Sequence, residues 1–434
     1  MRILREGTKA WKDELSRCAG RGYTSSKEVR EIVAQIIELV RVRGDDALFE
    51  LTKKFDRFDP AKEGFVIGRE KMEEAFDRLP PSVRKVLLRM AERIEDFHSR
   101  QLERNLVVFN DAGASLSLMV APVEKAGIYA PGGKAAYPST VLMNGIPAKV
   151  AGVKEVYAAV PTPEGVVRDE VLAACFLAGV EKLFRVGGAQ AIAAFAFGTE
   201  TVPRVDVIAG PGNQFVTEAK KQLFGLVGID MLAGPSELVV IADSSADPHL
   251  AAYDLVSQAE HGEDAFVSLV TDSEEVARNV AAQVDEIASR EKRKEILARS
   301  LENAPAFVCR SMERAVEVVN LLAPEHLSVQ TEEPVRYLPL LKNAGTIFIG
   351  PWSPVAVGDY IAGINHTLPT GGSARFFSPL GVYHFLKRYN VVHYGRESLR
   401  EDVQDVARIA KREGLSAHGN AAAARFRKKE GGGG

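Results

Sequence analysis

The sequence predicts an α/β protein with two doubly wound parallel-sheet domains, an N-terminal helical region and a small C-terminal helical appendage. From about residue 115, short apolar runs alternate with helical stretches, a pattern typical of βαβ units on a parallel sheet. The chain has 434 residues, more than one compact core usually holds at roughly 150 residues per domain. Together these observations favour two sheets over one.

The first hundred residues show helical patterns. From Val29 to Val40 the apolar residues recur at 3.6-residue spacing, which predicts a helix with one face buried in a core. Gly44 is expected to end this helix. A second helical pattern covers residues 45–55, and a long charged helix follows the Pro80-Pro81 break.

The apolar runs and the stretches between them predict the sheets. The predicted strands are 117–123, 127–130, 155–160, 182–186, 205–210, 237–243, 266–271, 306–309, 327–329 and 346–349. The helices expected between the earlier strands are 141–152, 169–179, 189–198 and 213–225. After Gly381 the sheet pattern stops, residues 397–414 are expected to form a helix, and residues 428–434 are expected to be disordered.

Composition favours a small-molecule partner. Lysine and arginine total 55, aspartate and glutamate total 58, and the net charge of −3 provides no bulk positive field for nucleic acid or anionic membrane. Three widely spaced cysteines fit neither a disulfide framework nor a zinc ribbon, and they suit a reducing compartment. No run of 18 uncharged apolar residues occurs, so we expect a soluble cytoplasmic protein.

Three glycine-rich turns follow predicted strands, at 130–134, 187–191 and 210–213. Such turns bring bare backbone N–H groups to helix starts, where a phosphate can bind. None has the full spacing of a dinucleotide fingerprint or a P-loop. Ordinary strand-to-helix turns and a nucleotide site therefore both remain open.

Two pairs of residues suggest chemistry. Gln258 and His261 lie three apart at a predicted helix end, where they could hold a divalent metal or where the histidine could simply interact with the helix dipole. Glu325 and His326 are adjacent at a predicted strand start. They could act as a general acid and base, or could be a turn followed by a solvated histidine.

Two further segments carry candidate ligands in loops. Asp359 precedes a loop containing His366, and its carboxylate could complete a metal site or form a turn. His418 follows Glu413 and Gly414 just after a predicted helix end, the usual setting of a surface histidine.

Taken in order, several segments resemble the histidinol dehydrogenase family over about residues 25–420. They are GIYAPGGKAAYPSTVLM, GGAQAIAA, AGPGN, AGPSE, QAEHG, APEHL, GDY with AGINHTLPTGG, and EGLSAH. The resemblance implies a homodimer that depends on Zn²⁺ and NAD. It also implies oxidation of L-histidinol through L-histidinal to L-histidine with two NAD⁺.

The resemblance also implies residue roles. The zinc ligands would be Gln258, His261, Asp359 and His418, and the acid–base pair would be Glu325 and His326. Substrate contacts would come from Ser236 and Glu413, from His326 and from the four zinc ligands. NAD contacts would come from Tyr129, Gln190 and Asn213.

These roles give a predicted domain plan. Residues 1–24 would form an N-terminal helical segment, and residues 25–128 with 237–380 a Rossmann-like domain carrying the metal and catalytic residues. Residues 129–236 would form a second, incomplete Rossmann-like domain for NAD, and residues 381–434 a dimerisation segment exchanged between subunits. The alternatives are a relative acting on another small primary alcohol and a non-catalytic metal-binding protein.

Overall fold

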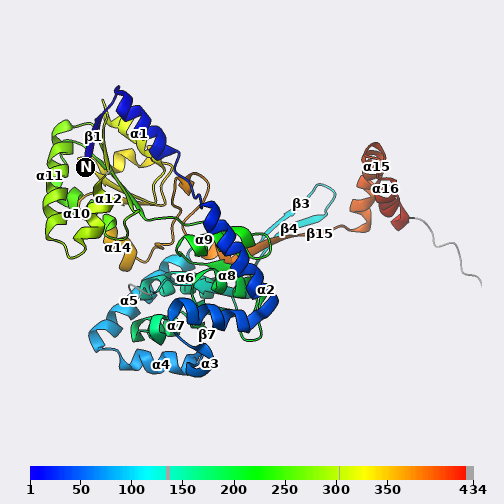
Figure 1. Cartoon of the computed structure of the whole chain (residues 1–434). Helices are drawn as coiled ribbons and strands as arrows, with labels where there is room; N and C mark the ends of the chain where they lie inside the picture. Colours follow the sequence, from blue (N-terminus) through cyan, green and yellow to red (C-terminus); the bar gives the residue numbers. More distant parts are fainter. Residues whose placement is uncertain (133–136, 303, 427–434) are drawn as a thin grey trace, which may run out of the picture. The chain divides into compact units, whose positions relative to one another are not determined.

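The computed structural model describes residues 1–132, 137–302 and 304–426. The chain divides into two units, one of residues 1–102 with 123–385 and the other of residues 103–122 with the chain from 386 onward (Figure 1). The prediction of an α/β fold with parallel sheets is confirmed. None of the described helices is long and apolar enough to cross a membrane.

The first sheet of the larger unit has six strands, all parallel. In order across the sheet they are β1 (Arg2–Arg5), β12 (Pro305–Val308), β11 (Phe266–Thr271), β10 (Glu237–Ala242), β13 (His326–Gln330) and β14 (Thr346–Ile349). Alternate residues of β10 point to opposite faces: Leu238 and Val240 join one core cluster, whereas Val239 and Ile241 join another. Both faces are therefore apolar and both are covered by helices.

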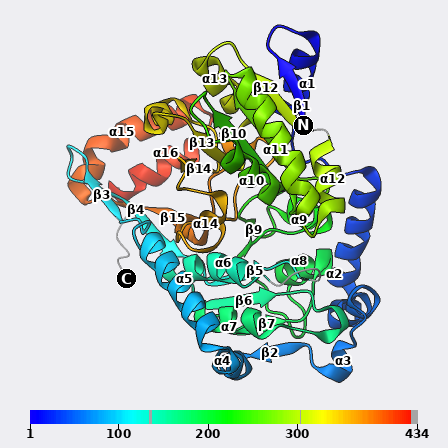
Figure 2. The ribbon, with the colours of Figure 1, turned by 90° about the vertical axis from the view of Figure 1, so that its left-hand side faces the viewer.

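The helices on these two faces come from different parts of the chain. One face carries α10 (Pro248–Ala259), α11 (Glu274–Arg290), α12 (Lys294–Glu302) and α14 (Val355–Tyr360), the first three of which lie together in Figure 2. The other face carries α1 (Lys9–Ala19) and α13 (Met312–Leu322).

The second sheet of this unit also has six strands. In order they are β2 (Val66–Gly68), β7 (Lys182–Phe184), β6 (Glu155–Ala159), β5 (Lys125–Tyr129), β8 (Val207–Ala209) and β9 (Gly228–Ile229), with only the β2–β7 pair antiparallel. On β5, Gly127 faces Phe195 of α8 while Ile128 faces Gly145 of α6. The two sides of this sheet therefore carry different helices.

The helices around the second sheet pack in layers. On one side lie α2 (Lys27–Asp56), α8 (Gly188–Phe197) and α9 (Gln214–Leu223). On the other lie α6 (Pro138–Ala151) and α7 (Asp169–Leu177), with α5 (Pro81–Ser99) packed on α6 and α4 (Arg69–Arg78) packed on α7. The remaining short elements are α3 (Pro60–Glu63) and the 3₁₀ turns η1 (Pro163–Gly165), η2 (Pro334–Leu340), η3 (Ser373–Arg375) and η4 (Val382–Phe385).

Helix α2 shows how the sequence sets local structure. The Ser26 hydroxyl accepts the backbone N–H of Val29 at 3.2 Å and caps the helix start. At Gly44 the backbone turns to a φ of 51°, so the helical path breaks there, as the sequence predicts, before it resumes.

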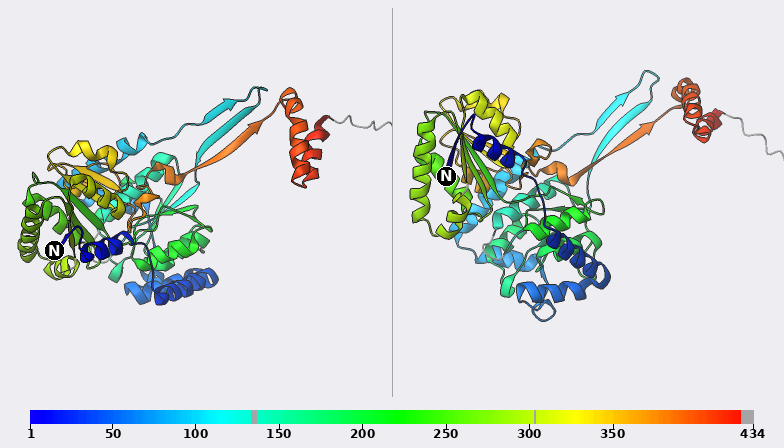
Figure 3. Two further views of the ribbon diagram at one scale, coloured as in Figure 1. Left: turned by 90° about the horizontal axis from the view of Figure 1, so that it is seen from above. Right: turned by 45° about the horizontal axis from the view of Figure 1, so that its top comes forward.

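The smaller unit is a three-stranded antiparallel sheet with two helices. Its strands, in order, are β15 (Leu386–His393), β4 (Ser115–Pro122) and β3 (Leu106–Phe109), drawn in orange and cyan in Figure 3. Its helices α15 (Arg396–Arg412) and α16 (Ser416–Ala423) pack on each other, and η5 (Ala424–Phe426) follows.

The structure corrects three features of the predicted domain plan. Residues 25–128 do not join the sheet of residues 237–380, because the apolar stripe of α2 packs with Phe184 and Phe195 on the second sheet. Residues 1–24 are not only helical, because β1 pairs with β12 at the edge of the first sheet. The order of elements along the chain does not reveal that α2 packs on the second sheet or that β1 pairs with β12.

The third correction concerns the smaller unit. The run at 117–123 was expected in a parallel sheet, but it forms most of β4, which pairs antiparallel with β3 and β15. No strand was expected after Gly381, because β15 mixes Lys387, Arg388 and Asn390 with its apolar residues. Residues 428–434 lie outside the described residues.

Candidate active site

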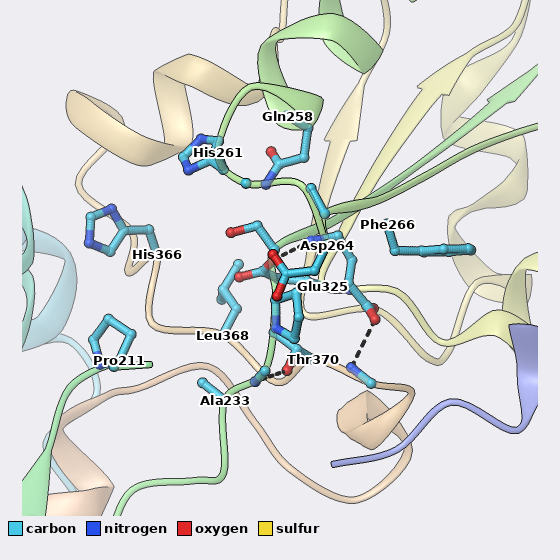
Figure 4. A pocket seen from close by; sticks show the side chains of 18 of the residues that line it. Pro211, Ala233, Gln258, His261, Asp264, Phe266, Glu325, His366, Leu368 and Thr370 are labelled. Carbon is cyan, nitrogen blue, oxygen red and sulfur yellow. Dashed lines mark hydrogen bonds between the residues drawn. The ribbon is translucent and has the colours of Figure 1, made fainter. Parts of the chain in front are cut away.

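A cavity of about 820 Å³ in the larger unit contains most of the predicted site residues (Figure 4). Its walls include the turn after β8, the segment leading into β10, the end of α10, the start of β13 and the end of α14. The cavity therefore lies at the amino-terminal edge of the first sheet and the carboxyl-terminal edge of the second. The predicted residues that line it are Asn213, Ser236, Gln258, His261, Glu325, His326 and Asp359.

Glu325 and His326 are buried side by side in this cavity. The His326 Nδ1 lies 2.9 Å from the backbone oxygen of Glu237 and 3.4 Å from the Glu325 carboxylate. A carbonyl oxygen only accepts hydrogen bonds, so Nδ1 carries the proton of the neutral ring and Nε2 keeps the lone pair. The Nε2 atom lies 3.7 Å from an Asp359 carboxylate oxygen and is the ring nitrogen that can exchange a proton with a molecule in the cavity.

Burial and charge oppose each other at this pair. Burial lowers the pKa of His326, but the carboxylates of Glu325 and Asp359 outweigh burial and raise it to about 10. Burial raises the pKa of Glu325, and the neighbouring His326 only partly offsets it. Glu325 is therefore a stronger base than an exposed carboxylate, which suits proton transfer near neutral pH.

Gln258, His261 and Asp359 are three candidate metal ligands on the cavity wall. Figure 4 shows Gln258 and His261 side by side at the end of α10. Burial raises the pKa of Asp359, but the hydrogen bond to His326 and the charge of that ring outweigh burial and keep the carboxylate ionised. The carboxyl-terminal end of α10 adds partial negative charge, which favours a cation.

His366 also lines the cavity, although the sequence suggested it only as a neighbour of Asp359. Its Nε2 lies 3.0 Å from the Thr140 hydroxyl and its Nδ1 lies 3.2 Å from the backbone oxygen of Asp359. Burial lowers the pKa of His366, so the ring is neutral. Two further cavity residues had no predicted role: Arg21, which stands in no motif, and Glu237, the last residue of the AGPSE segment.

The predicted NAD residues are not all in the cavity wall. Asn213 lines it, and its side-chain oxygen caps α9 by accepting the N–H groups of Phe215 and Val216 at 3.0 and 3.1 Å. Tyr129 and Gln190 are buried and are not among the residues that line it, and the Tyr129 hydroxyl accepts the Gly188 N–H at 3.1 Å. Residues 133 and 134 of the first glycine-rich turn lie outside the described residues.

The turn at 210–213 requires its first glycine. Gly210 has a φ of +117°, and an added Cβ would lie 2.0 Å from the Tyr129 backbone oxygen. The Gly210 N–H donates to Asp230 at 2.7 Å, and the buried Lys220 donates to the Gly210 oxygen at 3.0 Å. Lys220 and Asp230 also form a buried ion pair with each other, so this pair fixes the conformation of the turn.

Glu413 and His418 belong to the smaller unit, where both are exposed. Within residues 1–132, 137–302 and 304–426, no three His, Cys, Asp or Glu side chains form a metal site. The cavity itself offers two such side chains of the predicted set, His261 and Asp359, together with the amide of Gln258.

Comparison with known proteins identifies the family. The family model described as histidinol dehydrogenase matches residues 19–426. This chain belongs to the histidinol dehydrogenase family. It is 47% identical to the histidinol dehydrogenase of Aquifex aeolicus, over 99% of this chain and 100% of that protein. It is 46% identical to that of Syntrophotalea carbinolica, over 98% and 99% of the two chains.

A solved structure of the same family has the same fold. The crystal structure of histidinol dehydrogenase from Elizabethkingia anophelis has a TM-score of 0.91 and 34% identity, over 98% of both chains. The chain is therefore an NAD-dependent oxidoreductase of histidine biosynthesis, and histidinol is the substrate of its family. The functional prediction made from the sequence motifs is confirmed at this level.

Proposed function

We propose that the cavity oxidises L-histidinol to L-histidine in two steps, through L-histidinal, with one NAD⁺ consumed in each. The observation that carries this proposal is the buried Glu325–His326 pair, whose ring tautomer is fixed by the Glu237 carbonyl. A divalent cation at Asp359, proposed below, would offset the charge that keeps a proton on the His326 Nε2. In the first step this Nε2 then accepts the hydroxyl proton while a hydride leaves the carbinol carbon. NAD, when bound, accepts that hydride.

The second step needs water. The Glu325 carboxylate takes a proton from the water that adds to the aldehyde, while His326 returns the proton it took in the first step to the carbonyl oxygen, which gives the hydrate. His326 then accepts a hydroxyl proton as the second hydride leaves. Burial raises the pKa of Glu325 and so strengthens this base. Asn213, at the turn after β8 and beside the start of α9, would contact NAD together with Tyr129 and Gln190.

Because Glu325 is assigned only to the second step, its substitution should slow the two oxidation steps to different extents. Glu325→Gln should slow oxidation of L-histidinal by about 100-fold and formation of the aldehyde by less than about 10-fold, since only the former needs activated water. Single-turnover measurements with L-histidinol and with L-histidinal supply the two rates. Equal losses in both steps would contradict the assignment.

We also propose that Gln258, His261, Asp359 and His418 hold Zn²⁺. An ionised buried carboxylate, a neighbouring imidazole and an amide oxygen fit a divalent cation, and the end of α10 adds negative potential. When bound, the zinc would hold and orient the imidazole and amine of the substrate. Ser236 and Glu413 would contact the substrate beside these ligands, as would His326.

The smaller unit would complete the site through a homodimer. All four residues of β3 are exposed, with Phe109 at 72% and Leu106 at 54%, although adjacent residues of a strand point to opposite faces. Val391 and Val392 of β15 are likewise exposed neighbours. A three-stranded sheet with apolar side chains exposed on both faces is expected to bury them against another protein surface. We propose that a second copy provides it, so that Glu413 and His418 enter the partner's cavity.

Exchange of the smaller units predicts complementation. His326→Ala and His418→Ala chains should each be inactive as homodimers, but in a mixed dimer one site collects both defects and the other collects neither. Co-expression should therefore restore activity, to about a quarter of the wild-type level for random pairing and shared sites. A mixture as inactive as the homodimers, with mixed dimers shown by differently tagged chains, would contradict the exchange.

We place this reaction in the cytoplasm. Cys18, Cys175 and Cys309 are all buried free thiols, the state expected in a reducing compartment.

A further inference from the structure

Glu237, the first residue of β10, contacts both members of the catalytic pair. Its backbone N–H donates to the Glu325 carboxylate at 2.7 Å, and its backbone oxygen lies 2.9 Å from the His326 Nδ1. Its own carboxylate accepts the backbone N–H of Glu325 at 3.4 Å and that of Gly371 at 3.0 Å. Main chain and side chain of Glu237 therefore both define where the pair lies.

Arg21, from the segment between α1 and α2, fixes the Glu237 carboxylate in a two-point contact. Its Nε and Nη2 donate to the two carboxylate oxygens at 3.0 and 3.2 Å. The guanidinium also donates to the backbone oxygens of Cys18 and Leu322 and lies 3.8 Å from the centre of the Phe266 ring. A planar guanidinium held this way orients a carboxylate in a manner that a lysine ammonium does not reproduce.

The charges explain why this arginine is needed. Glu237 and Glu325 are two buried carboxyl groups in one site, with only 3% and 6% of their surfaces exposed. Like charges at short range in a dry environment repel, and the charge of Glu237 contributes to the raised pKa of Glu325. Without Arg21, the buried Glu237 carboxylate would lose the charge that balances it, and its repulsion of Glu325 would favour displacement of one of the two side chains.

We propose that Arg21 and Glu237 are positioning residues that hold Glu325 and His326 in their reactive arrangement, with Arg21 acting through the Glu237 carboxylate. This inference rests on the acid–base roles proposed above. Neither residue is assigned a chemical step. A displacement of about 1 Å at a catalytic group can cost about 100-fold in rate, so loss of Arg21 should lower kcat while leaving NAD⁺ binding at the 210–213 turn intact.

The test compares Arg21→Gln, Arg21→Lys and Glu325→Gln, with Arg17→Gln as the matched control. Arg17 lies in the same N-terminal segment and pairs with Glu14, but its side chain is 60% exposed. Arg21→Gln should lower kcat for L-histidinal by about 10- to 100-fold with the KM for NAD⁺ within about twofold, and Arg21→Lys should recover part of this loss. Arg17→Gln should match the wild type.

The Arg21→Gln/Glu325→Gln double variant separates positioning from general damage. If Arg21 acts through Glu325, the combined loss should fall short of the product of the single losses by about tenfold. Losses that multiply, or a wild-type kcat in Arg21→Gln, would overturn the inference. If Arg21→Gln does not fold, Arg21→Lys replaces it in the single and double variants, and losses that multiply would again overturn the inference. A wild-type rate in Glu325→Gln would instead reject the acid–base role on which the inference rests.

Discussion

Replacing His326 with alanine is expected to lower kcat for L-histidinol by about 1,000-fold, the largest effect of any single substitution in this chain. The His326 Nε2 is the only ring nitrogen of this residue left free by the bond to the Glu237 carbonyl, and both oxidation steps need it to accept a proton. Steady-state NADH formation and single-turnover rates for each step measure the loss.

The matched control is His249→Ala. The His249 ring lies at the exposed start of α10, 2.8 Å from the Gln283 side-chain oxygen. It should leave kcat unchanged within about twofold. A His326→Ala enzyme that retains more than about a tenth of the wild-type kcat in either step would remove His326 from the proposed role.

Removal of the metal is expected to have the second-largest effect. Chelation should reduce turnover to below about 1% of its initial value, because the substrate would lose the group that orients its imidazole and amine, and added Zn²⁺ should restore it. Elemental analysis of the purified protein should give one divalent ion per chain. Asp359→Asn should lose this ion, since it removes the one carboxylate of the proposed ligand set.

Glu263→Gln serves as the control for metal content. Glu263 is two residues from His261 in the chain, but its exposed carboxylate pairs with Arg299. This variant should keep both the ion and the activity. Full activity in protein that elemental analysis shows to be metal-free would contradict the zinc proposal.

Local patterns in the sequence were sufficient for much of the fold. The 3.6-residue stripe of α2 and the break at Gly44 both appear in the structure, and so do most of the apolar strands. The sequence does not reveal which sheet an apolar stripe packs against, because burial against any apolar surface removes the stripe from water equally well. Residues 25–128 were therefore placed with the wrong sheet, and the partly charged strand β15 was not predicted.

Some residues of the candidate site could likewise be predicted from local patterns, and others could not. Gln258 and His261 at a helix end and Glu325 with His326 at a strand start were recognisable as local groupings, and the cavity brings them together with Asp359. No role was predicted for Arg21 or for Glu237, although Glu237 ends the AGPSE segment, because their importance lies in a contact between residues 216 positions apart. No local pattern contains a contact of that kind.

We propose above that one cavity carries a primary alcohol through to the acid. The yield of NADH when limiting L-histidinol is oxidised to completion, measured beside other small primary alcohols, decides whether it does. We expect two NADH per L-histidinol, L-histidine as the product, and no comparable turnover of the other alcohols. One NADH per L-histidinol with release of L-histidinal, or faster oxidation of another alcohol, would contradict it.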